Sequence, residues 1–353
     1  MENTPGRDPL VQPRLTRAWY VAATSDELKK GPLQRIIHEV PVVLFRGADG
    51  SPGALLDRCP HRSVPLSFGE VIEGKLQCGY HGWAFSAAGR CVAVPGLVGE
   101  ADKDSRSCRA FPVREQQGMI WVWTDLEHAP DSEPFRFPYA DNRDYLTVRQ
   151  TLEAPAGVHA VAENALDVPH TSFLHGGLFR TDKDRSEITC VVQRWGDRVE
   201  AEYIGEARPE GVVGRILSPS GGVVTHFDRF RLPSIVEVEY RIGDENHIHL
   251  NGALTPVSDH VTKLYAVVSV RTRVPTWLVR PIVQPIALHI FGQDRVVLKL
   301  QTESVHRFGE ISFVSTEIDL LGPHILRLLR QAERGDSEKT DSQSYRREVK
   351  MLV

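Results

Sequence analysis

The sequence has no long hydrophobic run. The most apolar stretch in its 353 residues is WLVRPIVQPIALHIF, residues 277–291, which Arg280, Gln284 and two prolines interrupt. It is too short to span a bilayer, so we expect a core segment there in preference to a membrane-surface patch. The N-terminus also lacks a charged region followed by an apolar one, and we therefore expect no signal peptide and a cytoplasmic protein.

The sequence also has no excess of positive charge. The formal net charge is −4, and no basic run stands out. These features argue against a protein that binds nucleic acid. The sequence contains no Gly-x-Gly-x-x-Gly after a predicted strand, so we expect neither NADH nor flavin to bind to this chain.

Cysteine is scarce. The chain has five cysteines, an odd number that does not fit a disulfide framework in a chain of this length. Cys91, Cys108 and Cys190 are predicted to be reduced, buried thiols that pack as small apolar residues. Cys59 and Cys78 differ from them, because each lies close to a histidine in a short turn.

The first third of the chain has the pattern of short β-strands. β-branched and aromatic residues recur in brief segments, and turn signals such as Asp49-Gly50 separate them. Such a pattern favours a small antiparallel barrel or sandwich, which we place at residues 15–126. A polar, proline-rich segment at 127–138 is the expected linker. The expected strands are 19–23, 35–47, 53–58, 82–86, 90–94 and 118–124.

Residues 139–335 follow a different pattern. Helical periodicity is present in 155–175 as far as Pro169, and again in 323–334. Between them, alternating segments predict an antiparallel sheet with one solvent-facing side. We therefore expect an α+β fold, in which the β domain is followed by an antiparallel sheet flanked by helices, of helix-grip type. Residues 336–353 are polar and are predicted to form a loose tail. The expected strands of the sheet are 188–194, 198–205, 224–231, 234–242, 246–254 and 262–273.

Two cysteine–histidine pairs carry the first chemical signal. They are Cys59-Pro-His61 and Cys78-Gly-Tyr-His81, separated by 16 residues. Zinc accepts two thiolates and two imidazoles around one point, although zinc fingers more often keep both cysteines in one turn. A Rieske cluster puts both thiolates on one iron and both imidazoles on the other, so each turn must supply one of each. The observed pattern favours the cluster over zinc.

On these residues the sequence resembles the Rieske proteins: Cys-x-His, sixteen residues, Cys-x-x-His, then Gly-Trp. The resemblance implies that Cys59 and Cys78 hold the inner iron of a [2Fe–2S] cluster, and that His61 and His81 hold the outer iron. Rieske proteins of respiratory complexes have an additional cysteine in each turn. Valine and tyrosine stand at those positions here, which favours the oxygenase or ferredoxin subtype. A ferredoxin would end near residue 125, whereas this chain continues to residue 353.

A second group of ligand types follows in ENALDVPHTSFLH, residues 163–175. Non-haem Fe(II) requires two imidazoles and a carboxylate on one face, with the other positions open. Residues five apart on an ideal helix point about 140° away from each other, so His170 and His175 can converge only if the helix breaks. Pro169 and Gly176-Gly177 are plausible breaks.

This segment resembles the mononuclear-iron motif of the Rieske non-haem iron oxygenases, Asn-x-x-Asp-x-x-His-x-x-x-x-His. Asn164, Asp167, His170 and His175 match its four positions. The resemblance implies that His170 and His175 bind Fe(II). It also implies that Asp167 bonds to His170 and bridges to the cluster histidine, His81, of a neighbouring subunit.

The third ligand is expected on a late helix of the catalytic domain, by the same resemblance. Asp294 in FGQDRVVLKLQ, residues 291–301, fits that position, and Glu303 and Asp319 are weaker candidates. The competing interpretation of Asp294 is a solvated aspartate on a helix surface. We assign His159, His289 and His306 to packing or to the surface.

The resemblance implies a function as well as a fold. The chain would be the terminal oxygenase of an α3 system, a homotrimer that uses O2 and electrons from a separate NAD(P)H-dependent reductase, with or without a ferredoxin. Its substrate would be a hydrophobic small molecule with an aromatic or sterol-like ring. That hint comes from Phe173, Leu174, Leu178 and Phe179, for most of which ordinary core packing is the simpler explanation. The alternatives are a Rieske electron carrier with a non-catalytic C-terminal domain, and a zinc hydrolase, which would leave the cysteine–histidine pairs without a purpose.

Overall fold

The structure is a computed structural model that describes seven stretches of the chain: 12–175, 185–206, 223–243, 246–272, 276–311, 313–336 and 342–353. Within 276–283 it describes the side chains of 281 alone. The chain divides into two compact units. The first is Thr16–Arg136 with Thr255–Ser258, and the second is Phe137–Leu254 with Asp259–Val353 and the described residues before Thr16.

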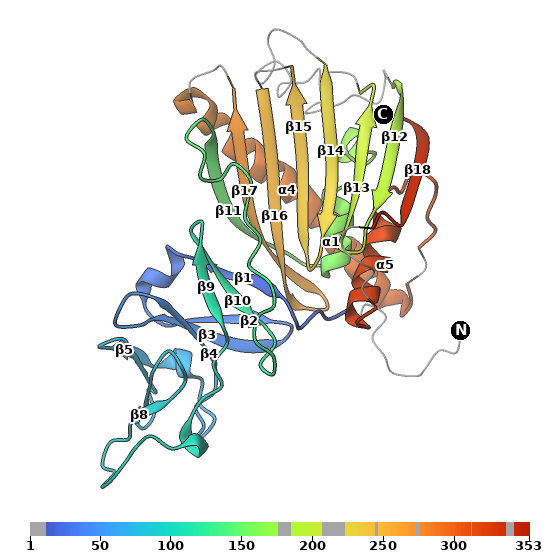
Figure 1. The fold of residues 1–353 in the computed structure, drawn as a ribbon. Coiled ribbons are helices and arrows are strands. Elements are labelled where there is room, and N and C mark those ends of the chain that lie inside the picture. The colour runs from blue at the N-terminus through green and yellow to red at the C-terminus, as the bar shows by residue number, and fades with distance from the viewer. Residues whose placement is uncertain are drawn as a thin grey trace. The chain divides into compact units, whose positions relative to one another are not determined.

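The N-terminal unit consists of three small antiparallel sheets (Figure 1). Two have three strands and one has four, in the orders β1-β10-β9, β2-β3-β4 and β5-β6-β7-β8. The predicted antiparallel β architecture is therefore confirmed. The strands are β1 Trp19–Thr24, β2 Leu33–Ile37, β3 Val40–Arg46, β4 Pro52–Leu56, β5 Glu70–Ile72, β6 Lys75–Gln77, β7 Ala84–Phe85, β8 Cys91–Ala93, β9 Val113–Gln116 and β10 Met119–Trp123. Short 3-10 helices lie at Glu27–Lys30, Leu66–Phe68 and Asp104–Arg106.

One predicted strand of this unit is two strands. The segment 35–47 turns back on itself between β2 and β3, at His38 and Glu39. Both residues have positive φ, 50° and 66°, which is the backbone of a two-residue hairpin turn. The prediction failed there because such turns usually carry glycine or asparagine, and this one carries neither.

The second unit is built on one antiparallel sheet of eight strands, in the order β11-β17-β16-β15-β14-β13-β12-β18. Figure 1 shows the helices of this unit on one face of the sheet. The strands are β11 Leu146–Ala154, β12 Glu187–Arg194, β13 Arg198–Ile204, β14 Val224–Arg231, β15 Ile235–Ile242, β16 Asn246–Ser258, β17 Val261–Arg271 and β18 Tyr345–Leu352. The helices are α1 Val158–Ala165, α2 Thr171–Leu174, α4 Thr276–Phe308 and α5 Gly322–Glu333.

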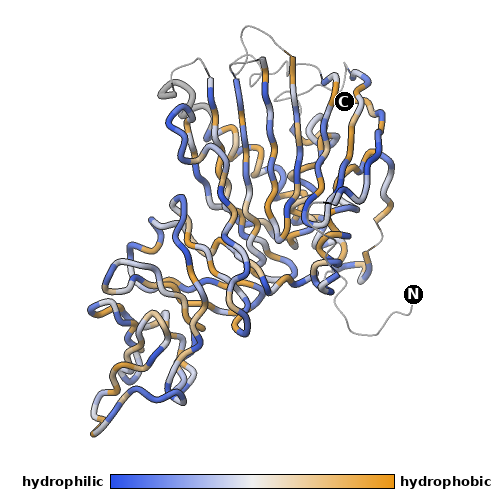
Figure 2. The backbone as a smooth tube through the Cα atoms, in the orientation of Figure 1, coloured by the Kyte–Doolittle hydropathy of each residue, from blue (hydrophilic) through white to orange (hydrophobic). Residues whose placement is uncertain are grey.

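Alternation along the strands separates the two faces of this sheet. Residues along β14 are buried and half-buried in turn. Figure 2 shows hydrophilic and hydrophobic residues following one another along the strands of this sheet. One face supplies Val199, Phe230 and Val236 to the core that α1 and α5 complete with Val161 and Leu328. The helices cover this apolar face because it is the one that must leave water.

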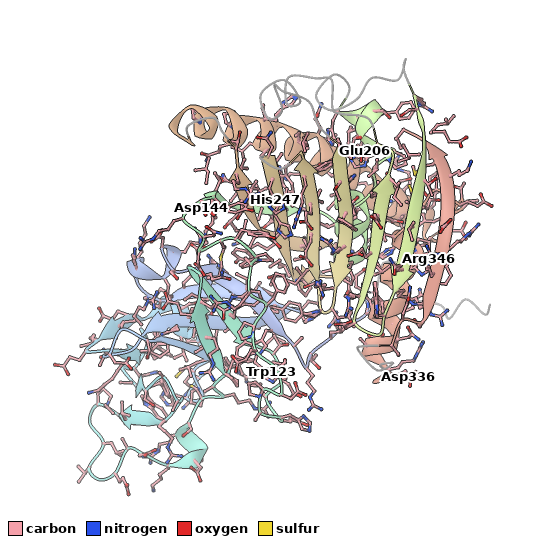
Figure 3. All side chains as sticks on the ribbon, turned by 45° about the horizontal axis from the view of Figure 1, so that its top comes forward. Trp123, Asp144, Glu206, His247, Asp336 and Arg346 are labelled. Atoms are coloured by element: carbon pink, nitrogen blue, oxygen red, sulfur yellow. The ribbon has the colours of Figure 1, made fainter. Side chains whose placement is uncertain are left out.

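The other face of the sheet carries charged residues, as the predicted solvent-facing side should. Several of them are nevertheless buried and paired with one another. Glu239 is 7% exposed, accepts from Arg229 at 2.7 Å, and lies 3.0 Å from His247 Nε2. Figure 3 labels His247 among the side chains of the sheet. Their mutual hydrogen bonds make that burial tolerable.

Two predictions about the second unit were wrong. Residues 345–352 are not a loose tail but the edge strand β18, which pairs with β12 and buries Val349 and Met351. Residues 277–291 lie in the first half of α4, and the side chains described there, those of 281 and 284–291, are exposed or half-buried and not a buried core segment. No helix in the described part of the chain is long and apolar enough to cross a bilayer.

Candidate metal centres

Two short loops of the N-terminal unit present the cysteine–histidine pairs. The first follows β4, where the carbonyl oxygen of Cys59 accepts from Ser63 N at 2.9 Å and its backbone N–H donates to Val64 O at 2.8 Å. The second joins β6 to β7, where Cys78 N donates to Trp83 O at 2.8 Å, and Gly82, at φ 72°, closes the turn. Each loop is thus a tight turn fixed by its own backbone, and glycine allows the positive φ at the second.

The four side chains are sorted by type. Both thiols are 2% exposed, and burial, with the Cys78 thiol alongside, raises the pKa of Cys59 to about 11. The rings of His61 and His81 lie together on the outer side, with centroids 4.6 Å apart. Sulfur faces sulfur and imidazole faces imidazole, which is the arrangement that a two-iron cluster needs.

The same geometry argues against zinc at these pairs. A tetrahedral ion would draw all four ligand atoms to one point. Among the described residues, one group of three His, Cys, Asp or Glu side chains has its ligand atoms within 4.8 Å of one another, and that group lies in the other unit. The cysteine–histidine pairs do not form such a group. Nδ1 of His61 is buried and makes no hydrogen bond to any described residue, as expected of an atom reserved for a metal.

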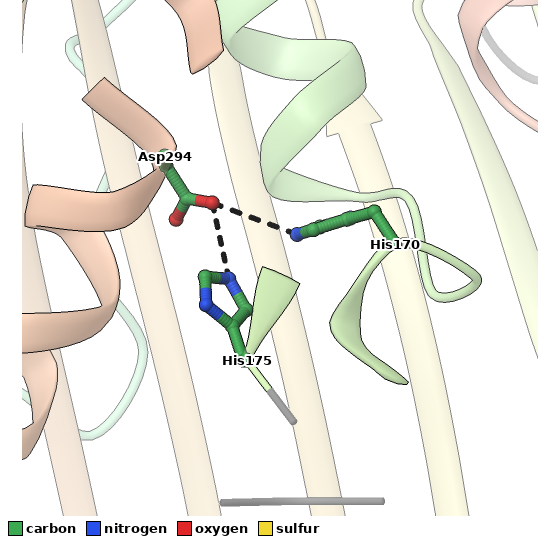
Figure 4. A group of neighbouring side chains, drawn as sticks. All are labelled: His170, His175 and Asp294. Atoms are coloured by element: carbon green, nitrogen blue, oxygen red, sulfur yellow. Dashed lines mark ion pairs between the residues drawn. The ribbon is translucent and has the colours of Figure 1, made fainter. Parts of the chain in front are cut away.

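The second unit brings His170, His175 and Asp294 together (Figure 4). The Oδ1 atom of Asp294 is 3.0 Å from His175 Nε2 and 3.6 Å from His170 Nε2. The two histidines flank the one-turn helix α2, and Asp294 lies in the middle of α4. The expected break in the helix is present, since α1 ends at Ala165 and α2 begins only at Thr171; Gly176 and Gly177 lie outside the described residues.

The three side chains lie close together, but they do not satisfy the hydrogen-bonding capacity of the Asp294 carboxylate. His175 is 2% exposed, and Oδ1 of Asp294 is buried. Although Oδ1 is 3.0 Å from the imidazole, it makes no hydrogen bond of normal geometry to any described residue. Burying a carboxylate oxygen costs free energy unless it has a hydrogen-bond or ionic partner, and a cation between the three groups would be such a partner.

The electrostatics of the group also fit a cation. Burial lowers the pKa of His170, but the carboxylates of Asp167 and Asp294 outweigh it and raise that pKa from 6.5 to about 9. Burial would raise the pKa of Asp294, but the two imidazoles hold it below its usual value. The carboxylates thus favour a positive charge among these side chains, and a divalent cation can supply it in place of a proton.

Two further side chains contact the Nδ1 atoms of the two imidazoles. His170 Nδ1 lies 3.3 Å from Asp167 Oδ2, as the resemblance implied. His175 Nδ1 lies 2.8 Å from Gln293 Oε1, a residue that the sequence did not reveal. Asn164 and Asp167 line a cavity of about 260 Å³ beside His170.

The two weaker carboxylates do not join this group. Glu303 is exposed on α4 and pairs with Lys299 at 3.6 Å. Asp319 accepts hydrogen bonds from Thr316 in the segment before α5. The geometry therefore leaves Asp294 as the carboxylate beside the two histidines.

Comparisons with known proteins agree with this arrangement. The family model described as Rieske [2Fe-2S] domain matches residues 18–109, and the one described as vanillate O-demethylase oxygenase C-terminal domain matches 154–335. The chain is similar to the oxygenase component of dicamba O-demethylase of Stenotrophomonas maltophilia, with 38% identity over 50% of this chain and 52% of the relative. It is also similar to the oxygenase subunit of vanillate O-demethylase of a Pseudomonas species, with 35% identity over 55% of this chain and 56% of the relative.

A solved structure gives a longer match. The crystal structure of dicamba monooxygenase bound to dicamba has a TM-score of 0.77 and 25% identity, over 92% of this chain and 99% of that one. In sequence, the chain spans about half the length of the two curated relatives. A Rieske [2Fe–2S] domain followed by an oxygenase domain of this type defines the class. The chain belongs to the Rieske non-haem iron oxygenase family.

Proposed function

We propose that this chain is the terminal oxygenase component of a Rieske system, and that it inserts one oxygen atom into an aromatic substrate. The observation that carries the proposal is the convergence of His170, His175 and Asp294 on one buried point. A simple electron carrier has no use for such a group. The match of residues 154–335 to an oxygenase domain favours the oxygenase over the carrier.

The residues of the N-terminal unit would receive the electrons. Cys59 and Cys78 would hold one iron of the cluster, and His61 and His81 the other, since the thiols and the imidazoles are already sorted in this way. Among these ligands His81 is the exposed one, so electrons can enter or leave through it.

The residues of the second unit would hold a mononuclear Fe(II). Two imidazoles and one carboxylate are the facial set typical of iron enzymes that use O2, and the bound ion supplies the chemistry that activates oxygen. Asp167 keeps the His170 ring in place through Nδ1, and Asn164 stands beside it in the same cavity wall. The protein's own task is to orient these groups and exclude competing reactions.

The substrate class follows from the relatives. Two are named as O-demethylases, so we propose an aromatic methyl ether for this chain in place of a sterol-like ring. The reaction balances as R–O–CH3 + O2 + 2 electrons + 2 protons → R–OH + formaldehyde + water. The electrons would come from a separate NAD(P)H-dependent reductase, directly or through a ferredoxin.

The assembly and location are part of the same proposal. We propose a cytoplasmic homotrimer in which Asp167 of one subunit faces His81 of the next. Asp167 is suited to this role, because its side chain is about one-third exposed, at 32%, while its Oδ2 atom stays near His170.

The test is turnover with a surrogate reductase. Purified protein is supplied with NADH, the reductase and a panel of methoxybenzoates, while oxygen uptake and formaldehyde are recorded together. We expect formaldehyde in step with oxygen consumed for at least one member. Protein that carries the cluster and reduces an electron acceptor, but never releases formaldehyde or any other oxidised product, would contradict the oxygenase assignment.

A further inference from the structure

The imidazole of His175 is held from both sides by one helix. Asp294 and Gln293 are adjacent residues of α4, yet they reach opposite nitrogens of the same ring. Asp294 Oδ1 lies 3.0 Å from Nε2, and Gln293 Oε1 lies 2.8 Å from Nδ1. The ring itself is 2% exposed, so water does not compete for either nitrogen.

The contact with Gln293 determines where the ring carries its proton. An amide oxygen can only accept a hydrogen bond, so Nδ1 must donate and must carry hydrogen. In a neutral imidazole the lone pair is then left on Nε2, the nitrogen that faces Asp294. A metal ion at this point needs that tautomer.

The opposite orientation of the amide fits the structure poorly. If the amide nitrogen of Gln293 faced the ring, it would donate to Nδ1 and hydrogen would move to Nε2. Nε2 would then be protonated. It lies 3.0 Å from Asp294 Oδ1 but outside the geometry of an ordinary hydrogen bond, so Oδ1 would stay buried and unsatisfied. No hydrogen bond of normal geometry reaches Oδ1 from any described residue. With hydrogen on Nδ1, Nε2 and Oδ1 both keep lone pairs that one cation can accept.

The two histidines are held by different chemistry. His170 Nδ1 has a carboxylate partner, Asp167, at the longer distance of 3.3 Å. His175 Nδ1 has a neutral amide partner at 2.8 Å. The side chain of Asp167 is about one-third exposed, so it is placed to do more than orient a ring, whereas the contact of Gln293 is with a buried imidazole.

We propose that Gln293 is a positioning residue of the mononuclear site: its amide oxygen holds His175 in the tautomer and ring orientation that present Nε2 to the ion. This inference rests on the proposed function, in which His170, His175 and Asp294 bind Fe(II). Partners of this kind typically change metal affinity by about 10- to 100-fold when they are removed.

The test compares three variants of the full chain with its cluster intact. Gln293→Met keeps the length of the side chain but cannot accept the hydrogen bond well. Gln293→Glu can only accept, and therefore enforces the proposed role. Lys299→Met is the control, because Lys299 is exposed on the same helix and pairs only with Glu303 among the described ion pairs. After the mononuclear iron is removed by mild chelation, Fe(II) rebinding is measured anaerobically by competition with a coloured chelator. The visible absorbance of the cluster is the internal standard.

We expect the dissociation constant for Fe(II) to rise by about 10- to 100-fold in Gln293→Met. Gln293→Glu should bind Fe(II) at least as tightly as the wild type, and Lys299→Met should match it. A Gln293→Met protein that binds Fe(II) as the wild type does would overturn the inference, and so would a Gln293→Glu protein as weak as Gln293→Met. If the wild type itself failed to rebind Fe(II), that result would contradict the proposed function. It can be told apart from the two results above, in which the wild type binds Fe(II) and only the variants depart from expectation.

Discussion

Single residues decide whether the second unit holds an ion. His170 and His175 flank α2 and Asp294 lies in α4, far away in the sequence, and their ligand atoms still lie within 4.8 Å of one another. Both histidines could be expected from the sequence, because their spacing matches a motif. Asp294 was a choice among three carboxylates, and only the fold separates it from Glu303 and Asp319. Gln293 carries no sequence signal, since a glutamine on an amphipathic helix is ordinary.

Substitution of Asp294 tests the carboxylate ligand. Asp294→Ala removes the carboxylate that faces Nε2 of both imidazoles, so we expect the mononuclear iron to be lost and the cluster to remain. Iron per chain should fall from about three to about two, because the cluster accounts for two. Metal analysis with EPR of the reduced cluster provides the measurement. Asp319→Ala is the matched control and should keep all the iron; unchanged iron in Asp294→Ala would mean that another group is the ligand.

Substitution of Asp167 tests a residue beside the ligands. Asp167→Asn keeps the size of the side chain but removes the negative charge near His170 Nδ1. We expect both iron centres to be retained and turnover to fall by at least about tenfold, as for other groups that orient a ligand. The measurement is formaldehyde release per cluster. Full activity would remove Asp167 from the mechanism.

At the scale of elements, the inner strands of the sheet in the second unit could be predicted better than its two edge strands, β11 and β18. The strands from β12 to β17 alternate clearly, and their expected ranges agree with the structure within a few residues at nearly every end. β11 and β18 were missed, because Arg149, Glu153 and the charges of 346–350 hide the alternation. The first half of α4 was missed for another reason: Pro281 and Pro285 lie inside the helix, where proline is normally disfavoured.

The edge strand β18 gives a direct test of this correction. Met351 is 4% exposed and Leu352 is 58% exposed, although they are neighbours on one strand. Met351→Ala should lower the free energy of unfolding by about 2 kcal/mol or more, because it leaves a cavity in the core. Leu352→Ala should change it by less than about 0.5 kcal/mol. Equal, small effects in urea titrations of both variants would mean that residues 345–352 do not pack as a strand.

Strands β13 and β14 contain a buried charge that makes stability depend on pH. His226 lies between Glu206 at 2.7 Å and Asp228 at 3.0 Å, and the rings of Tyr203 and Tyr240 stack on it. Burial lowers the pKa of His226, but the two carboxylates outweigh it and raise that pKa from 6.5 to about 9. The sequence offered no sign of this cluster, since its members are distributed over three segments.

A pKa raised on folding stabilises the protein while the imidazole is charged. The contribution is complete below pH 6.5 and is lost as the pH rises through about 9. We expect the free energy of unfolding to fall by about 3 kcal/mol across that interval, from about 1.4 kcal/mol per unit of pKa. Urea titrations at several pH values provide the measurement, and His226→Gln should flatten the dependence. A wild-type stability that rises over this range would contradict the charged imidazole.

At the scale of the whole molecule, two units divide the chemistry between them. The first holds a pair of turns in which thiols and imidazoles are sorted by type, and the second brings two imidazoles and a carboxylate together. The order of the domains could be predicted, and motifs of fixed spacing drew attention to the cysteines and histidines of both groups, whereas the fold was needed to separate Asp294 from the other carboxylates. The substrate could not, because the residues that shape a substrate cavity come from many strands and follow no common spacing.

The central claim is that one chain carries two separate iron centres, and anomalous X-ray scattering from crystals of the purified protein tests it most directly. Data collected on either side of the iron absorption edge should show one iron between His170, His175 and Asp294. They should also show two adjacent irons, one beside Cys59 and Cys78 and the other beside His61 and His81. A signal that appears at the zinc edge instead, or no metal between the two histidines and Asp294, would contradict the account.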